Sequence, residues 1–535
     1  MLAAVTLLGA CRAEQPTVDA TTIDATTMAE RAVDDTPSTT TRARSLGTTT
    51  QPTRSTQPTA IEPVSVSGPL EGGDGPANGL ADQLEAVGYT ETEWAVEGAA
   101  TAYRPLGRTP GNGRWTVTPT TVAPFRTRIL VRRPDAPRFS GTVIVEWLNV
   151  SAGFDSHPDW TYTADEIVRS GHAWVGVSAQ AVGVGGGTDA LGRPAGGGLM
   201  AASPERYGRL VHPGDAYSFD IFTQAARALE HHDGPAPLGD LRIDRTIAIG
   251  ASQSAFFLST YVNAVQPLTG QFDGFLVHSR GRPVASLDGR GNLGPTDSPT
   301  VQIRDDLDQP VMIVAAENDL TILEYAQARQ PDRATVRTWE IAGTAHADEY
   351  LVRTSAGLGA DVDVGALLGC TTPLNDGPHG EVLRAALRHL VVWAGGGPPP
   401  PPVPRIELAS LRPAVIARDD TGIALGGVRT PHVDVPTTIL TGDPAPDAAA
   451  FCVLFGQTLP IDPAVLASRY PSAGRYLELV TASLDAAVEL GVILVDDAAA
   501  VLDQARSRSM MFEVTRSTAG SPKANTQSVV PTVTT

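Results

Sequence analysis

The stretch TIAIGASQSAFFLSTY, residues 246 to 261, is the most informative part of the sequence. Its opening run, Thr246 to Ile249, is apolar and rich in β-branched residues, which predicts a buried strand. The apolar residues after Ser254 predict a helix that follows at once. Ser252 therefore lies on a tight strand-to-helix turn, where a strained backbone holds its hydroxyl clear of the fold.

Small residues are needed around such a turn, because a bulky side chain two positions either side of Ser252 would strike the neighbouring strand or helix. Gly250 meets this need, and Ser254 stands where the pattern usually has glycine. The turn also aims the unpaired N–H groups of the helix start at the reacting atom. We predict that Ser252 is a nucleophile. The alternative is an ordinary turn between a strand and a helix.

A serine hydroxyl is a poor nucleophile at neutral pH and needs a histidine base that a carboxylate orients. The turn around Ser252 predicts the chain order serine, acid, histidine, with both partners on loops after later strands. One strand-like run leads into Glu317 and Asp319, and the next leads into His346. We predict His346 as the general base and Asp319 as the acid. Glu317 stays open as the alternative acid, because it lies only two residues away.

Acyl transfer also needs N–H donors for the tetrahedral oxyanion. We expect the first donor to be the backbone of Gln253, the residue after the nucleophile. The second is expected from the backbone of Val150, in the loop after the predicted strand 142–148. Asn149 and Trp147 could shape the pocket beside this loop, although Trp147 could equally belong to the core.

Predicted strands and helices alternate over about 250 residues, which is typical of a mostly parallel, doubly wound α/β sheet. The early strands follow one another without a helix, which indicates an antiparallel edge. The predicted strands are 90–104, 126–132, 142–148, 173–178, 243–249, 272–278, 310–316 and 335–341, and the predicted helices are 80–87, 159–169 and 217–231.

Three Gly-, Pro- and Asp-rich stretches interrupt this alternation: 181–214, 281–309 and 351–378. Insertions at the carboxyl ends of parallel strands are where a lid or a substrate pocket is built. A run of five prolines predicts a stiff connector over residues 398–404. Residues 405–513 follow as a C-terminal segment without a catalytic pattern, and we expect it to pack on the core.

The N-terminal part predicts a leader and a tether. Thirteen of the twenty-five residues from Thr36 to Ala60 are Ser or Thr, and such a segment buries too little surface to offset its ordering entropy. We expect residues 1–11 to form a signal, 12–78 a disordered tether and 79–397 the core. Residues 514–535 are expected to be a disordered tail.

The chain has three cysteines. Cys11 ends the run MLAAVTLLGAC, which resembles a bacterial lipobox, where the cysteine is lipidated and becomes the mature N-terminus. No Lys or Arg precedes the run, a departure from the usual signal. We expect export, and possible membrane attachment through Cys11. In an oxidising compartment Cys370 and Cys452 would then form a disulfide. The alternative is two buried free thiols.

Composition excludes several classes of protein. The formal net charge of −19 and the lack of a basic stripe disfavour binding to nucleic acid. The sequence has no window of eighteen apolar residues, so it predicts no membrane-spanning helix. The glycine run at 185–187 lacks the lysine and helix of a phosphate loop, and no metal-ligand spacing occurs. The sequence therefore implies neither a metal nor an organic cofactor.

Five motifs together resemble one family: GASQSA, VEWLNVSAGFD, HPGDAYSFDIF, WEIAGTAHAD and GGVRTPHVDVP. They are similar to those of the bacterial and fungal "alpha/beta hydrolase domain-containing" family. The resemblance extends to about Asp497, so the C-terminal segment belongs to the family's domain. It implies the α/β-hydrolase fold and an esterase-like serine hydrolase.

We therefore interpret the chain as an exported serine hydrolase of carboxylic esters, whose substrate is a small molecule, a lipid or a polymer. One alternative is an amidase or an acyltransferase of the cell envelope with the same triad. The other is a surface-binding lipoprotein without catalytic activity.

Overall fold

The computed structural model describes residues 64–189, 192–194, 196–289, 299–449 and 451–510, and all of them lie in one compact unit, Pro63–Thr535. Cys11, the tether up to residue 63 and the tail 514–535 lie outside these residues, so what we expect of them stays a prediction. None of the helices among the described residues combines the length and the hydropathy that a membrane-spanning helix needs.

Ten strands of the described residues form one sheet in the order β10-β9-β8-β7-β4-β5-β3-β2-β1-β6. From β5 through β4 to β10 every neighbouring pair is parallel, whereas β3, β2 and β1 add antiparallel pairs. The mostly parallel sheet and its antiparallel edge are thus confirmed. The strands are β1 (Val64–Ser67), β2 (Tyr89–Pro105), β3 (Val117–Pro134), β4 (Thr142–Trp147), β5 (Ala173–Val177), β6 (His232–Asp233), β7 (Arg245–Ala251), β8 (Gly274–His278), β9 (Val311–Ala315) and β10 (Val336–Glu340).

One predicted boundary is wrong. β1 lies inside the stretch 12–78 that the sequence assigns to a tether, and its Val66 pairs with Val96 of β2. The ordered chain therefore begins before Gly79. A strand of four residues between polar segments has too little periodicity to be recognised, and only its pairing with the long strand β2 shows that it belongs to the sheet.

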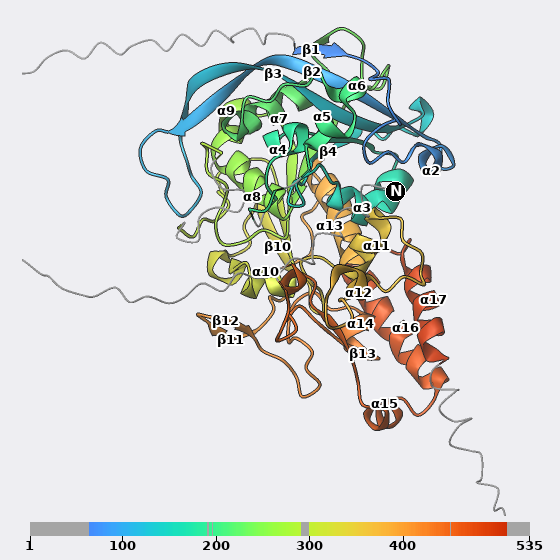
Figure 1. The fold of residues 1–535 in the computed structure, drawn as a ribbon. Coiled ribbons are helices and arrows are strands. Elements are labelled where there is room, and N and C mark those ends of the chain that lie inside the picture. The colour runs from blue at the N-terminus through green and yellow to red at the C-terminus, as the bar shows by residue number, and fades with distance from the viewer. Residues whose placement is uncertain (1–63, 190–191, 195, 290–298, 450, 511–535) are drawn as a thin grey trace, which may run out of the picture. The chain divides into compact units, whose positions relative to one another are not determined.

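Alternate residues of the central strands pack on opposite faces of the sheet. Val143 and Val145 of β4 join a core cluster with residues of α7 (Ser218–Arg227) and α8 (Gln253–Thr260). Ile144 joins a second cluster with residues of α3 (Pro158–Arg169) and α13 (His379–Ala394). Figure 1 shows α8 and α13 on the two sides of the strands. Because both faces are buried, these strands appear in the sequence as continuous apolar runs.

Helices cover the sheet, and some of the described helices lie in the insertions 181–214 and 351–378. Insertion 181–214 holds α4, α5 and α6, and insertion 351–378 holds α12 and most of α11. The helices are α2 (Ala81–Glu85), α3 (Pro158–Arg169), α4 (Ala181–Gly185), α5 (Gly198–Ala202), α6 (Pro204–Tyr207), α7 (Ser218–Arg227), α8 (Gln253–Thr260), α9 (Gln266–Thr269), α10 (Glu317–Thr321), α11 (Glu349–Ser355), α12 (Val364–Leu368), α13 (His379–Ala394), α14 (Pro431–Asp434), α15 (Pro463–Arg469), α16 (Ala473–Leu490) and α17 (Ala498–Ser509).

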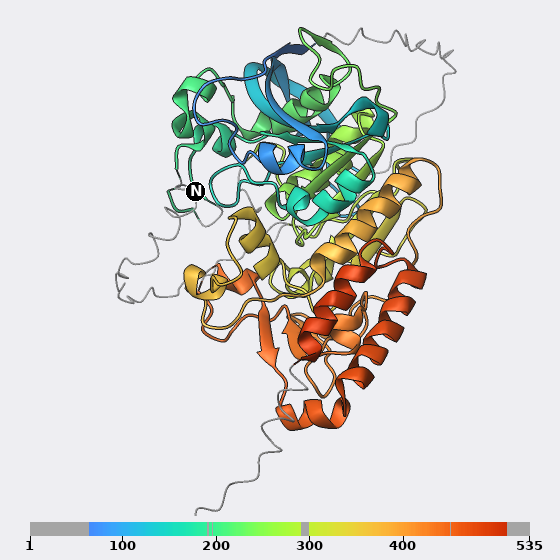
Figure 2. The same ribbon diagram turned by 90° about the vertical axis from the view of Figure 1, so that its right-hand side faces the viewer.

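The C-terminal segment packs on the sheet and shares both apolar cores. Ile406 and Val433 belong to the cluster with α8, and Val428 and Leu484 belong to the cluster with α13. In Figure 2, α16 and α17 lie side by side in the red C-terminal part of the chain. The segment also holds two short hairpins, β11 (Leu408–Leu411) with β12 (Ala414–Ile416) and β13 (Thr438–Thr441) with β14 (Gln457–Pro460).

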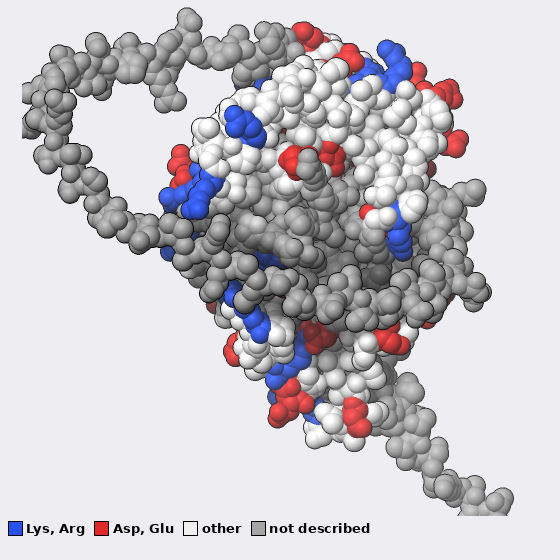
Figure 3. Space-filling model, turned by 60° about the vertical axis from the view of Figure 1, so that its left-hand side comes forward, with Lys and Arg blue, Asp and Glu red and all other residues white. Residues whose placement is uncertain are grey.

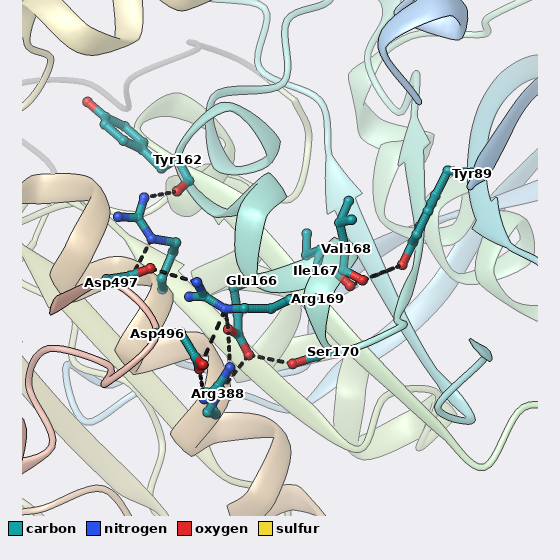
Figure 4. Close-up of polar contacts among 11 residues, drawn as sticks. Tyr89, Tyr162, Glu166, Ile167, Val168, Arg169, Ser170, Arg388, Asp496 and Asp497 are labelled. Atoms are coloured by element: carbon teal, nitrogen blue, oxygen red, sulfur yellow. Dashed lines mark hydrogen bonds and ion pairs between the residues drawn. The ribbon is translucent and has the colours of Figure 1, made fainter. Parts of the chain in front are cut away.

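A network of charged side chains joins the start of α17 to α3 and α13 (Figure 4). Glu166 of α3 accepts hydrogen bonds from Arg169, at 2.6 Å, and from Arg388 of α13, at 2.7 and 2.8 Å. Arg169 in turn bonds Asp497, and Arg388 bonds Asp496, at 2.6 and 2.7 Å. Because Glu166 is fully buried, it needs these partners. The network therefore ties the C-terminal helices to the core.

The structure brings Cys370 and Cys452 together as a disulfide. Cys370 follows α12 in the insertion 351–378, and Cys452 lies in a short 3₁₀ turn, Cys452–Leu454, of the C-terminal segment. The two residues are 82 apart in sequence. In the chain-entropy account, closing a loop of this length stabilises the folded state by roughly 4–5 kcal/mol, less any strain.

The described surface carries charges of both signs. On the face in Figure 3, blue basic and red acidic side chains lie in small separate groups among uncharged residues. The chain as a whole has 40 Lys and Arg against 59 Asp and Glu. No continuous basic stripe is visible on the described part of that face.

Candidate functional site

Ser252 lies between β7 and α8, as the sequence predicts. Its backbone has φ 57° and ψ −123°, a region that side-chain-bearing residues rarely adopt. Its N–H donates to the carbonyl of His278, at the end of the neighbouring strand β8, at 2.9 Å. A Cβ added at Gly250 would lie 3.3 Å from atoms of Ser254. The close approach of these two positions explains why small residues flank the turn.

Three side chains that follow three different strands, β7, β9 and β10, form a hydrogen-bonded chain. Nε2 of His346 lies 2.8 Å from Oγ of Ser252, and Nδ1 of His346 lies 2.6 Å from Oδ1 of Asp319. The other carboxylate oxygen of Asp319 accepts the N–H of Ala316 at 2.7 Å. A carboxylate at Nδ1 favours the tautomer with the proton on that nitrogen. Nε2 is then free to accept the proton of the serine hydroxyl.

Glu317, the alternative acid, points elsewhere. Its carboxylate accepts the N–H groups of Gly343 and Gly442, at 2.6 and 2.9 Å, and pairs with Arg418 at 2.8 Å. Glu317 and Asp319 are both in the first turn of α10, where two positions correspond to a rotation of about 200° around the helix axis. They therefore face opposite directions, and only Asp319 contacts His346.

The two predicted oxyanion donors have free N–H groups. Within the described residues, neither the N–H of Gln253 nor that of Val150 has a hydrogen-bond acceptor. Asn149 joins their two loops, because its Nδ2 donates to the carbonyl of Ala251 at 2.9 Å and its Oδ1 accepts the N–H of Ser151 at 2.8 Å. This geometry is compatible with the predicted role of the two groups.

Trp147, which the sequence could not place, belongs to the core. It is fully buried, and its ring packs against the rings of Phe222 and Phe257. Its Nε1 donates to Oε1 of Gln180 at 3.1 Å, and the same oxygen accepts Nε2 of Gln253 at 2.9 Å. Trp147 therefore helps to hold the first residue of α8 in place.

A second cluster of buried titratable groups was not predicted from the sequence. Nδ1 of His278 lies 2.7 Å from Oδ1 of Asp159, and its Nε2 lies 2.7 Å from Nε2 of His379. Burial lowers the pKa of His278 to about 3 and lowers that of His379 as well. Burial raises the pKa of Asp159. Both histidines are therefore neutral at pH 7. The three residues of this cluster come from β8, α3 and α13, so no local sequence pattern contains all of them.

Replacing His278 with glutamine is expected to make a pH-dependent difference to stability. Its folded-state pKa lies below the ordinary 6.5, so between these values the unfolded chain binds more protons than the folded one. The contribution of His278 to the free energy of unfolding is present above pH 6.5. It is lost as the pH falls, by up to about 1.4 kcal/mol per pH unit. The stability difference between wild type and H278Q should therefore narrow from pH 7.5 to pH 5.

Urea unfolding at the two pH values measures this difference. The matched control is His231→Gln, because the side chain of His231 is exposed. If wild type and H278Q differed in free energy of unfolding by the same amount at both pH values, the inference that burial keeps this ring neutral would be contradicted.

In the described part of the chain, no group of three or more His, Cys, Asp or Glu side chains is arranged to hold a metal ion. Residues 66–503 match a family model described as "Alpha/beta hydrolase domain". The chain belongs to this family. The match includes most of the C-terminal segment, which is therefore part of the family's domain.

Several solved structures are similar to this chain. A thermostable esterase from Pseudomonas putida is 14% identical, with a TM-score of 0.28, over 60% of this chain and 92% of its own. A glucuronoyl esterase from Solibacter usitatus is 10% identical, with a TM-score of 0.26, over 56% and 87%. A serine hydrolase without a lid from Xanthomonas campestris is 14% identical, with a TM-score of 0.24, over 49% and 89%. A search of curated proteins finds no match.

Proposed function

We propose that this chain is a serine hydrolase that cleaves carboxylic esters through an acyl-enzyme. The observation that carries the proposal is the hydrogen-bonded chain from Ser252 through His346 to Asp319. A serine whose proton can pass to a histidine, itself oriented by a buried carboxylate, is suited to nucleophilic attack. The strained backbone at Ser252 supports the same role, since strain of this kind gathers at functional sites.

In the proposed reaction, Oγ of Ser252 attacks the carbonyl carbon of the ester while Nε2 of His346 takes the hydroxyl proton. The N–H groups of Gln253 and Val150 stabilise the oxyanion. The C–O bond to the alcohol then breaks, and the leaving oxygen takes the proton from His346. A water molecule repeats the sequence on the acyl-enzyme and releases the acid and free Ser252.

The test uses a fluorophosphonate probe together with a matched ester and anilide. We expect one covalent label per chain, and hydrolysis of 4-nitrophenyl acetate well above hydrolysis of 4-nitroacetanilide. Preference for the anilide would indicate an amidase. A new ester formed in the presence of an added alcohol would indicate an acyltransferase. If the chain showed no labelling and no turnover, the result would indicate a binding protein without catalytic activity.

A further inference from the structure

Asn318 lies between the two acids in the first turn of α10, and its side chain bridges two parts of the molecule. Oδ1 accepts the backbone N–H of His346 at 2.6 Å. Nδ2 donates to the carbonyl of Leu454 at 3.0 Å and to that of Val453 at 3.3 Å. Asn318 is fully buried. An amide is the side chain that suits this position, because it accepts from an N–H group and donates to carbonyls.

The carbonyl of Leu454 also reaches the other side of His346. It accepts the N–H of Ala347, the next residue along the chain, at 3.1 Å. The backbone on both sides of the imidazole is therefore held, directly or through Asn318, by one peptide group of the C-terminal segment. That peptide group belongs to the 3₁₀ turn Cys452–Leu454, whose Cys452 is bonded to Cys370.

The C-terminal segment approaches the histidine loop closely at two glycines. A Cβ added at Gly456 would lie 2.8 Å from Cβ of Ala345, and the φ of this glycine is +54°. A Cβ added at Gly442 would lie 2.6 Å from Cβ of Glu317 and 2.9 Å from the carbonyl of Thr344. Backbones that approach this closely leave the loop little freedom to move.

We propose that Asn318 is a positioning residue. Together with the turn Cys452–Leu454, it holds His346 at the position from which its imidazole reaches Ser252. Asp319 orients the imidazole through Nδ1, and Asn318 fixes the backbone from which the ring projects. In this proposal the C-terminal segment positions the backbone of His346, in addition to packing on the core. This inference rests on the proposed function, since His346 must act as the base.

The test compares Asn318→Ala with Asn263→Ala. Asn263 is equally buried, accepts one backbone N–H at 3.0 Å, from Arg304, and donates to one carbonyl at 2.9 Å, that of Gln302. Among the described residues, neither of these partners forms a hydrogen bond with any of the three residues of the hydrogen-bonded chain. A displacement of about 1 Å in a catalytic group typically costs about 10²-fold in rate. We expect N318A to lower kcat by about 10²-fold with little change in KM, and N263A to leave both within about threefold at a temperature where both variants are folded.

A second arm frees the turn without touching Asn318. The Cys370→Ser/Cys452→Ser double variant should lower kcat, and in combination with N318A its effect should be smaller than in the wild-type background, because both changes release the same loop. This arm also decides the question if N318A does not fold. Equal kcat losses in N318A and N263A, or a double variant with unchanged kcat, would overturn the inference. A wild-type chain without turnover or labelling would instead refute the proposed function.

Discussion

Ser252→Ala is expected to abolish fluorophosphonate labelling and to lower kcat for ester hydrolysis by about 10⁴–10⁶-fold, the range that loss of the nucleophile costs other serine hydrolases. The reason is the hydrogen bond of 2.8 Å between Oγ of Ser252 and Nε2 of His346, since no other hydroxyl among the described residues bonds that nitrogen. The fold should persist, because alanine removes only one oxygen. Stopped assays and thermal melting measure the two effects.

Ser254→Ala is the matched control for this experiment. Ser254 is two residues away on the same turn and fully buried, and its hydroxyl has no hydrogen-bond partner among the described residues. We expect S254A to keep its labelling and most of its turnover. If S254A lost its label and S252A kept it, the nucleophile would have been assigned to the wrong serine.

Asp319→Asn should lower kcat by about 10⁴-fold, with a much smaller effect on KM. Asparagine can offer its NH₂ group to Nδ1 of His346, which favours the wrong tautomer of the imidazole. The proton would then lie on Nε2, and the ring could no longer accept the proton of Ser252. The pH profile of kcat/KM, measured with a soluble ester, separates this effect from a general loss of folded protein.

Glu317→Gln is the control that separates the two neighbouring acids. Glu317 holds Arg418 and the N–H groups of Gly343 and Gly442, and it makes no hydrogen bond to His346. Its replacement should lower the free energy of unfolding. The loss is expected to be at most about 3–5 kcal/mol, the usual cost of breaking a buried ion pair. The kcat of the folded fraction should change much less than in D319N. The reverse ranking would transfer the role of acid to Glu317.

Elements and candidate residues that depend on local patterns can be predicted from the sequence. The strand-turn-helix pattern at 246–261 lies in consecutive residues, so it predicts both a buried strand and the turn that presents the hydroxyl of Ser252. The candidates Asp319 and His346 follow from the same logic, because each lies directly after an apolar strand. Periodicity and small residues are properties of neighbours along the chain, and they can be recognised without knowledge of the fold.

Which side chains come into contact depends on the folded chain. The sequence favours Asp319 as the acid but leaves Glu317 open, and the choice between them depends on partners far along the chain, such as Arg418, 101 residues from Glu317. Asn318 bonds Leu454 across 136 residues, and His278 bonds His379 across 101. Contacts of this kind arise when the chain folds back on itself, so no window of the sequence contains both partners. For the same physical reason, β1 was recognisable as a strand only when paired with β2.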